Sequence, residues 1–100
     1  MVIIMVVAEV SIIPLSNGPS VSKYVKKAIS IFKKHNLKIN YGAMSTTIEG
    51  DLNEVLEAFK EAHNEVLKDT TRVVSSLKID ERKDKDNTIE RKLKSINAIE

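Results

Sequence analysis

The sequence predicts an α+β fold in which a four-stranded antiparallel sheet carries two helices on one face. Three observations predict it: a long alternating strand near the start of the chain, two segments with helical periodicity, and the interleaved order of strands and helices. The order is strand, helix, strand, strand, helix, strand, and then one more helix. We therefore expect a ferredoxin-like βαββαβ sandwich with an additional C-terminal helix, as a single domain over residues 1–100.

The first strand, residues 2–13, is apolar on one face and mixed on the other. Its even positions are all apolar: Val2, Ile4, Val6, Ala8, Val10 and Ile12. Its odd positions include Glu9 and Ser11 among hydrophobic residues. Because successive side chains of a strand point to opposite faces, we expect the even face under the helices and Glu9 on the other face. A strand so rich in Val and Ile is expected at the centre of the sheet.

Apolar residues at spacings of three and four predict the two helices that cover the sheet. In the first helix they are Val21, Tyr24, Val25, Ala28, Ile29 and Phe32. In the second helix they are Leu52, Val55, Leu56, Phe59, His63, Val66 and Leu67. Ser20 or Ser22 is the expected N-cap of the first helix. Asp51 precedes the second helix and forms, with Glu54, a D-x-x-E variant of the capping box.

Shorter elements complete the order. Residues 37–50 predict two short strands joined about Gly42 and Ala43, and residues 72–79 predict a last strand. Thr88 is expected to cap a final helix, over about residues 88–99. In this topology the first and third strands form the central pair, and the second and last strands are the edges.

One face of the predicted sheet has no helix over it, and we call it the open face. It is expected to carry Ile3, Met5, Val7, Glu9, Ser11, Ser45, Thr47, Glu49, Arg72, Val74, Ser76 and Lys78. Such a face is too apolar for water alone and too polar for a core, which favours packing between subunits around polar pockets. The C-terminal helix has no place in the two-helix layer, so we expect it on the open face or on a neighbouring chain.

The composition excludes several classes of function. With 16 Lys and Arg against 14 Asp and Glu, the net charge of +2 is too small for an electrostatic nucleic-acid binder. The absence of cysteine excludes disulfides, thiol nucleophiles and thiolate metal sites, and it fits the cytoplasm, where we expect the protein. The apolar start lacks a basic region and is interrupted by Glu9 and Pro14, which is against a signal peptide or a membrane span.

The sequence offers no clustered catalytic or metal-binding residues. His35 and His63 stand alone, which predicts a helix-end and a core-edge histidine rather than a metal site. Glu9 and Glu49 would be an acid–base pair only in principle, because no nucleophile or cofactor loop accompanies them. We therefore expect a protein that is not an enzyme and that has no cofactor and no metal.

Several short stretches, in order along nearly the whole chain, carry a family resemblance. They are residues 8–14 (Ala-Glu-Val-Ser-Ile-Ile-Pro), 47–50 (Thr-Ile-Glu-Gly), 62–63 (Ala-His), 72–73 (Arg-Val), 79–82 (Ile-Asp-Glu-Arg) and Lys92. In them the chain resembles the small thiamine-binding-like proteins of bacteria and archaea, related to the YkoF-type thiamine and hydroxymethylpyrimidine binding domain. The resemblance implies the ferredoxin-like fold, pairing through the sheets into dimers and tetramers, and, in some relatives, binding of thiamine or its pyrimidine precursor.

The candidate ligand-binding residues are Glu9, Ser11, Thr47 and Glu49, on two adjacent central strands of the predicted sheet. An aminopyrimidine presents a ring nitrogen and an exocyclic amine side by side. A carboxylate can pair with the protonated ring nitrogen or accept from the amine, and a hydroxyl can serve either role. The thiazolium ring of thiamine adds a positive charge that acidic side chains favour.

Three functions stay open at this point. The first is a cytoplasmic small-molecule binding protein, for thiamine or its pyrimidine precursor, that acts as a homo-oligomer, a dimer or tetramer formed through the open face. The second is a structural or interaction oligomer without a ligand, in which Glu9 and Glu49 pair with Arg72 or Lys78 across the interface. The third is an RNA-binding domain, ranked lower because such modules stack bases on sheet aromatics that the inner strands lack. We expect no nucleic acid and no membrane as partner.

Overall fold

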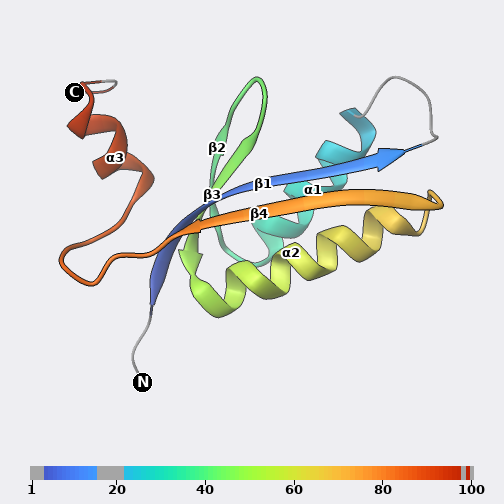
Figure 1. The fold of residues 1–100 in the computed structure, drawn as a ribbon, viewed down its shortest axis with the longest axis horizontal. Helices are drawn as coiled ribbons and strands as arrows, with labels where there is room; N and C mark the ends of the chain where they lie inside the picture. Colours follow the sequence, from blue (N-terminus) through green and yellow to red (C-terminus); the bar gives the residue numbers. More distant parts are fainter. Residues whose placement is uncertain (1–3, 16–21, 98, 100) are drawn as a thin grey trace.

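The computed structural model describes residues 4–15, 22–97 and 99. Its elements are β1 (Met5–Leu15), α1 (Ser22–Lys34), β2 (Lys38–Tyr41), β3 (Thr46–Asp51), α2 (Leu52–Leu67), β4 (Arg72–Asp80) and α3 (Ile89–Ser95). Figure 1 shows α1 and α2 on one side of the sheet, with α3 standing apart from them beyond the end of β4. The α+β, ferredoxin-like plan with an extra C-terminal helix is confirmed.

The sheet is antiparallel throughout, in the order β2-β3-β1-β4. The two central strands and the two edge strands are therefore those that the sequence predicts. Glu9 lies opposite Thr47 on one side and Lys78 on the other. Since side chains directly opposite each other share a face, this register places the odd residues of β1 on the open face. Ile3, predicted for the same face, lies outside the described residues.

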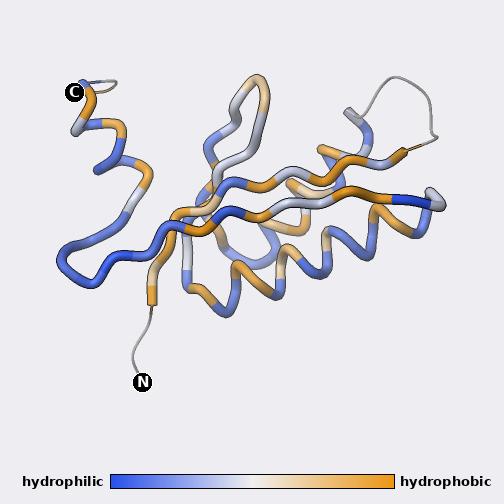
Figure 2. The backbone as a smooth tube through the Cα atoms, in the orientation of Figure 1, coloured by the Kyte–Doolittle hydropathy of each residue, from blue (hydrophilic) through white to orange (hydrophobic). Residues whose placement is uncertain are grey.

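The even face of β1 forms the floor of the core. Val6, Ala8 and Val10 are at most 4% exposed. They pack with a buried cluster that includes Ala28, Phe32, Ile48, Val55, Ala58 and Ala62. Figure 2 shows hydrophobic residues recurring along the strands and along α1 and α2, as this packing requires. Burial of each large apolar side chain contributes about 1.5–3 kcal/mol to the free energy of unfolding.

The buried stripe of α2 differs from the expected one. Ala58 and Ala62 are fully buried, whereas Leu56 and Leu67 are 43% and 39% exposed. A small side chain at the centre of the contact lets the helix backbone come close to the sheet, so the larger leucines fall at the margins.

α2 has 16 residues, and no helix of the described part of the chain is long and apolar enough to cross a membrane.

The helix ends follow most of the predicted caps. The Asp51 side chain accepts from the backbone N–H groups of Asn53 and Glu54, which confirms it as the N-cap of α2. Thr88 caps α3. α3 ends at Ser95, earlier than predicted, and Asn97 beyond it has a left-handed backbone with φ of 58°. For α1, Ser20 lies outside the described residues. The other candidate, Ser22, is its first helical residue.

Candidate functional site

The structure places the four predicted site residues on the open face. Glu9 lies opposite Thr47 across the central strand pair, and Glu49 lies opposite Val7. Ser11 follows Glu9 two positions along β1, so its side chain points to the same face. The four predicted residues therefore share one patch of the sheet, but the two carboxylates have different surroundings.

Glu49 is buried, with 5% of its surface exposed. Its Oε1 accepts a hydrogen bond of 2.8 Å from the backbone N–H of Ile89, in the first turn of α3. Its Oε2 lies 3.8 Å from Nζ of Lys38 on β2. Both carboxylate oxygens are thus engaged within the chain, and Glu49 fastens the start of α3 to the sheet. Val7 beside it is 7% exposed, which shows that this end of the open face is covered.

Further contacts hold the segment between β4 and α3 in place. The Asn87 side chain, 5% exposed, donates to the backbone carbonyl of Asp80 at 2.6 Å. The Asp80 carboxylate pairs with Lys92 on α3, and this hydrogen bond holds the pKa of Asp80 below its usual value. The loop and α3 therefore form a clasp over one end of the open face, built from Glu49, Asp80 and Asn87.

Glu9 is accessible where Glu49 is not. Its side chain is exposed, and the Ser45 hydroxyl donates to Oε2 at 3.3 Å. Ser45 belongs to the turn between β2 and β3, where its carbonyl also accepts from the backbone N–H of Gly42 at 3.0 Å. The carboxylate of Glu9 thus stands at the middle of the sheet, next to the β2–β3 turn, with room for a ligand.

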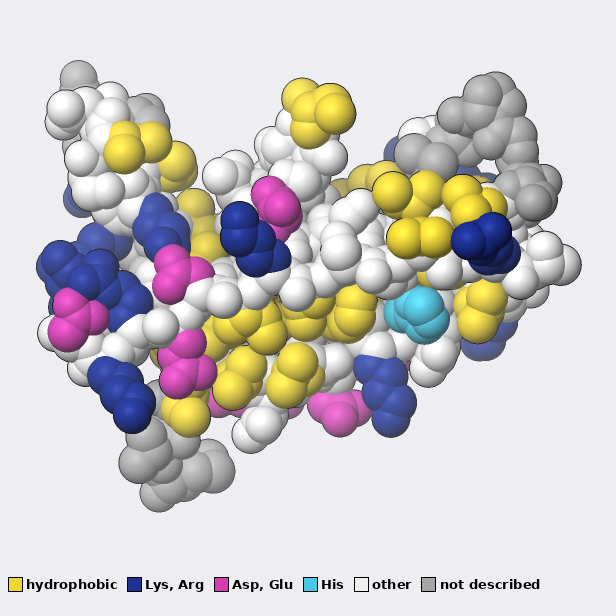
Figure 3. Space-filling model, viewed as in Figure 1, with side chains coloured by type: hydrophobic (Ala, Val, Ile, Leu, Met, Phe, Trp, Pro, Cys, Tyr) yellow, Lys and Arg dark blue, Asp and Glu magenta, His cyan; other side chains and the backbone are white. Residues whose placement is uncertain are grey.

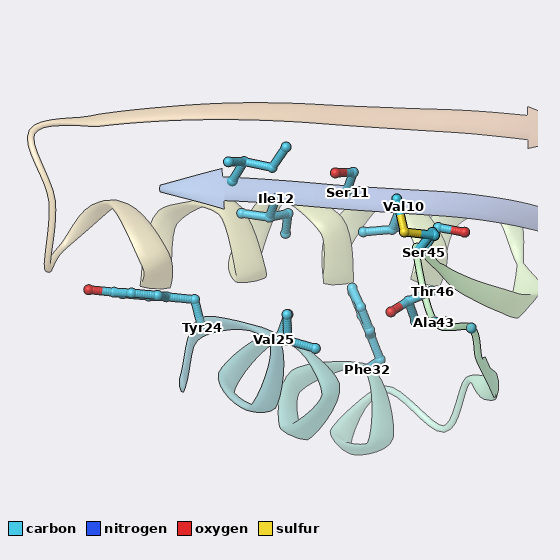
Figure 4. Close-up of a pocket in the computed structure, with 13 residues that line it drawn as sticks. Val10, Ser11, Ile12, Tyr24, Val25, Phe32, Ala43, Ser45 and Thr46 are labelled. Carbon is cyan, nitrogen blue, oxygen red and sulfur yellow. The ribbon is translucent and has the colours of Figure 1, made fainter. Parts of the chain in front are cut away.

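A cavity of about 350 Å³ opens beside Ser45, between α1, β1 and the β2–β3 turn. It forms because β1 pairs with β3 only as far as Val10, so the following residues of β1 have no strand on that side. Figure 4 shows Phe32 pointing from α1 toward β1, Tyr24 at the start of α1, and Ser11 on the opposite side of that strand. Volumes of this size suit small organic ligands.

The cavity walls are largely apolar, and its polar groups are hydroxyls. Phe32 and Tyr24 form the wall on the side of α1, and they are 1% and 6% exposed. Ser11 and Ser45 also line the cavity, which brings it to the edge of the patch that carries Glu9. Sequence reasoning did not identify Tyr24 and Phe32 as site residues, because their spacing fits the apolar face of an ordinary amphipathic helix.

The part of the chain that the structure describes holds no cluster of three or more His, Cys, Asp or Glu side chains that would suit a metal ion. His35 lies at the end of α1, between Glu54 and Glu61. His63 lies on α2 and hydrogen-bonds Ser75. The two histidines thus occupy the helix-end and core-edge positions that the sequence predicts.

Comparison with known proteins identifies one family over most of the chain. The family model described as thiamine-binding protein matches residues 8–97. UPF0045 protein MJ1052 of Methanocaldococcus jannaschii is 71% identical over 94 residues, which are 94% of each protein. UPF0045 protein YqgV of Bacillus subtilis is 34% identical over 99 residues, covering 93% of this chain and 95% of that protein.

Solved structures share the fold. The crystal structure of hypothetical protein MJ1052 matches with a TM-score of 0.92 at 70% identity, over 95% of this chain and 98% of that one. A Thermotoga maritima protein, TM0486, named for a proposed role in thiamine biosynthesis or salvage, matches with a TM-score of 0.78 at 24% identity. It covers 92% of this chain and 98% of that one, and at this identity the likeness concerns the fold alone.

Proposed function

This chain belongs to the family of thiamine-binding proteins, and from that premise we propose that it is a binding protein, not an enzyme, for thiamine or its pyrimidine precursor. The observation that carries the proposal is the exposed carboxylate of Glu9, joined through Ser45 to the edge of an apolar cavity. A cavity with a few polar groups at one side is the usual form of a small-molecule site.

The chemistry of an aminopyrimidine suits this arrangement. The Glu9 carboxylate accepts from the protonated ring nitrogen or from the neighbouring amine, in a charge-assisted hydrogen bond. The hydroxyls of Thr47, directly opposite Glu9 on β3, and of Ser11, two positions along β1, donate or accept as the ring requires. Beyond Ser45, on the other side of β1, the apolar wall of the cavity offers a surface against which a second ring of the ligand can pack.

In this proposal Glu49 acts differently from Glu9. Both of its oxygens are engaged by Ile89 and Lys38, so contact with a ligand would require the start of α3 to move. We propose that Glu49 supports the site by holding α3 in place, while Glu9, Ser11 and Thr47 contact the ligand.

A structural oligomer without a ligand is the second candidate function. Met5 and Ile13 are 42% and 44% exposed, and both lie on the open face. Exposed apolar side chains on one face of a sheet favour packing against another subunit. Assembly and ligand binding are compatible, so a direct binding measurement has to separate the two functions.

Calorimetric titration with thiamine and with hydroxymethylpyrimidine tests the proposal. Wild-type protein is expected to bind one or both. Glu9→Gln removes a charge-assisted hydrogen bond worth about 1.5–3 kcal/mol and is expected to weaken binding roughly ten- to a hundredfold. Glu57→Gln, which neutralises an exposed carboxylate on α2, is the matched control and is expected to leave affinity unchanged. A wild-type protein that binds neither compound refutes the ligand and favours the structural oligomer.

A further inference from the structure

A second depression lies at the edge of the molecule, between α2 and the edge strand β4. The residues that line it include Phe59, Lys60 and His63 from α2, and Arg72, Val74 and Ser75 from β4. We call it the β4 groove. It shares no lining residue with the cavity beside Ser45, so it is a separate feature of the surface. Because β4 is an edge strand, residues from both faces of the sheet meet there.

The centre of the β4 groove is a hydrogen bond of 2.7 Å between Nδ1 of His63 and Oγ of Ser75. Either arrangement of the proton leaves a donor available. If Ser75 donates to Nδ1, the ring carries its proton on Nε2. If Nδ1 donates to Ser75, the hydroxyl proton of Ser75 is free to bond elsewhere. Both side chains are half-buried, and in either arrangement the free donor belongs to this hydrogen-bonded pair.

Two positive charges flank this pair. Lys60 and Arg72 are exposed, and no carboxylate is among the lining residues of the β4 groove. Within the described residues neither forms an ion pair with a carboxylate, whereas Lys27 pairs with Asp69 and Lys34 with Glu61. Figure 3 shows a histidine on this side of the molecule, with Lys or Arg side chains nearby on two sides. The residues that line the groove thus supply donors and positive charge but no carboxylate.

We propose that the β4 groove is a second binding site, for the phosphate group of a small phosphate ester. The guanidinium of Arg72 presents paired donors that match phosphate oxygens, Lys60 adds a compact charge, and the His63–Ser75 pair supplies a third donor. A phosphate ester carries close to two negative charges at neutral pH and has three acceptor oxygens for them. The proposal is independent of the ligand assigned to Glu9.

Phe59 favours an ester over the free anion. Its ring is half-buried and lies beside His63, with ring centroids 6.5 Å apart and planes at 40°. It forms an apolar wall of the groove, against which the organic part of an ester can pack. Inorganic phosphate has no apolar part that could pack against Phe59, so this wall favours an ester.

Proton NMR of the histidine rings tests the proposal, with inorganic phosphate, phenyl phosphate and chloride as probes at constant ionic strength. Both phosphates are expected to shift the ring signals of His63, phenyl phosphate at the lower concentration, and chloride is expected to leave them unchanged. His35, whose two ring nitrogens are held by Glu54 and Glu61, is the internal control and should not respond. No response of His63 to either phosphate would overturn the proposal.

Substitutions then separate a built site from general positive charge. Arg72→Gln and Lys60→Gln are each expected to weaken phenyl phosphate binding roughly tenfold, because each removes a charge-assisted contact. Lys33→Gln, which removes an exposed lysine of α1, is the matched control and is expected to have no effect. Equal losses in the three variants would show diffuse electrostatic attraction and contradict a site in the groove. Equal affinity for the two phosphates would contradict the role of Phe59.

Discussion

His35 links the two helices of the layer through a single side chain. Its Nδ1 lies 2.8 Å from a carboxylate oxygen of Glu54, and its Nε2 lies 2.7 Å from one of Glu61. The Glu54 side chain therefore contacts His35 at the end of α1. It does not make the reciprocal bond to the N-cap residue that the predicted capping box would require. Asn36 follows with a left-handed backbone, φ 58°, and turns the chain from α1 toward β2.

Because of these two carboxylates, the contribution of His35 to the stability of the fold depends on pH. The hydrogen bonds with Glu54 and Glu61 raise the pKa of His35 above 6.5 in the folded protein. A raised pKa means that the fold favours the protonated ring, so the contribution to stability is complete below the unfolded pKa. It is lost as the pH rises through the higher folded pKa. The stability that His35 adds therefore decreases from about pH 6 upward.

Urea unfolding at pH 6 and at pH 9, on wild-type protein and on His35→Gln, measures this effect. The wild-type protein is expected to lose more of its free energy of unfolding between the two pH values than the variant does. His63 is present in both proteins, so the comparison isolates the contribution of His35. An identical pH dependence in the two proteins would show that the contacts of His35 contribute nothing to stability.

At the scale of elements, α3 depends on side chains from outside itself. It has seven residues and none of them is buried. A helix this short is unstable in water without external contacts. Glu49 supplies an acceptor to its first turn, and Asp80 pairs with Lys92 one turn further on. The clasp of Glu49, Asp80 and Asn87 therefore decides where α3 lies.

Glu49→Ala is expected to release α3 without unfolding the sheet. The substitution leaves the backbone N–H of Ile89 without its acceptor, at a cost of about 1–3 kcal/mol. Amide hydrogen exchange should accelerate about tenfold or more in α3, while the amides of β1 and β3 keep their protection. The control is Glu90→Gln, which removes only the exposed pair with Lys94 and is worth a few tenths of a kcal/mol. Unchanged exchange in α3 after Glu49→Ala would contradict the anchoring role.

The elements themselves were predictable, because their patterns are local. A period of two in β1, and spacings of three and four in α1 and α2, set the order of the elements and the face on which Glu9 and Ser11 lie. The burial of Glu49 was not predictable, since its partner Ile89 is 40 positions away. The cavity beside Ser45 could not be predicted from the sequence either, although the unequal lengths of the strands indicate it. β1 has 11 residues against 4 in β2 and 6 in β3, so part of its edge had to stay unpaired.

At the scale of the whole molecule, the chain is a flat body of 42 × 34 × 19 Å. One layer of helices covers one face of the sheet, and within the described residues the other face is covered by the start of α3 at one end. Met5 and Ile13 on that open face are 42% and 44% exposed, and Ile96 beyond α3 is 70% exposed. Their burial in an interface would contribute about 1.5–3 kcal/mol for each side chain that becomes fully buried. This favours assembly through the open face, into a dimer or tetramer.

Sedimentation equilibrium at micromolar concentration tests the assembly. The wild-type protein is expected to have two or four times the chain mass of 11.2 kDa. Met5→Lys is expected to dissociate it, since a charge in an apolar interface adds a desolvation cost to the lost burial. Leu56→Lys on α2, at a similar exposure of 43%, is the matched control and should keep the mass of the wild type. A wild-type protein that sediments as a single chain would refute the assembly.

The same variants connect assembly to the ligand. Met5 is not among the residues that line the cavity beside Ser45, so Met5→Lys leaves that cavity intact within the chain. If a neighbouring subunit closes the site over Glu9, dissociated Met5→Lys is expected to bind thiamine or hydroxymethylpyrimidine at least tenfold more weakly than wild type in the same calorimetric titration. Leu56→Lys should bind as the wild type does. Full affinity in a dissociated Met5→Lys protein would show that one chain forms the whole site, with Glu9, Ser11 and Thr47 sufficient for it.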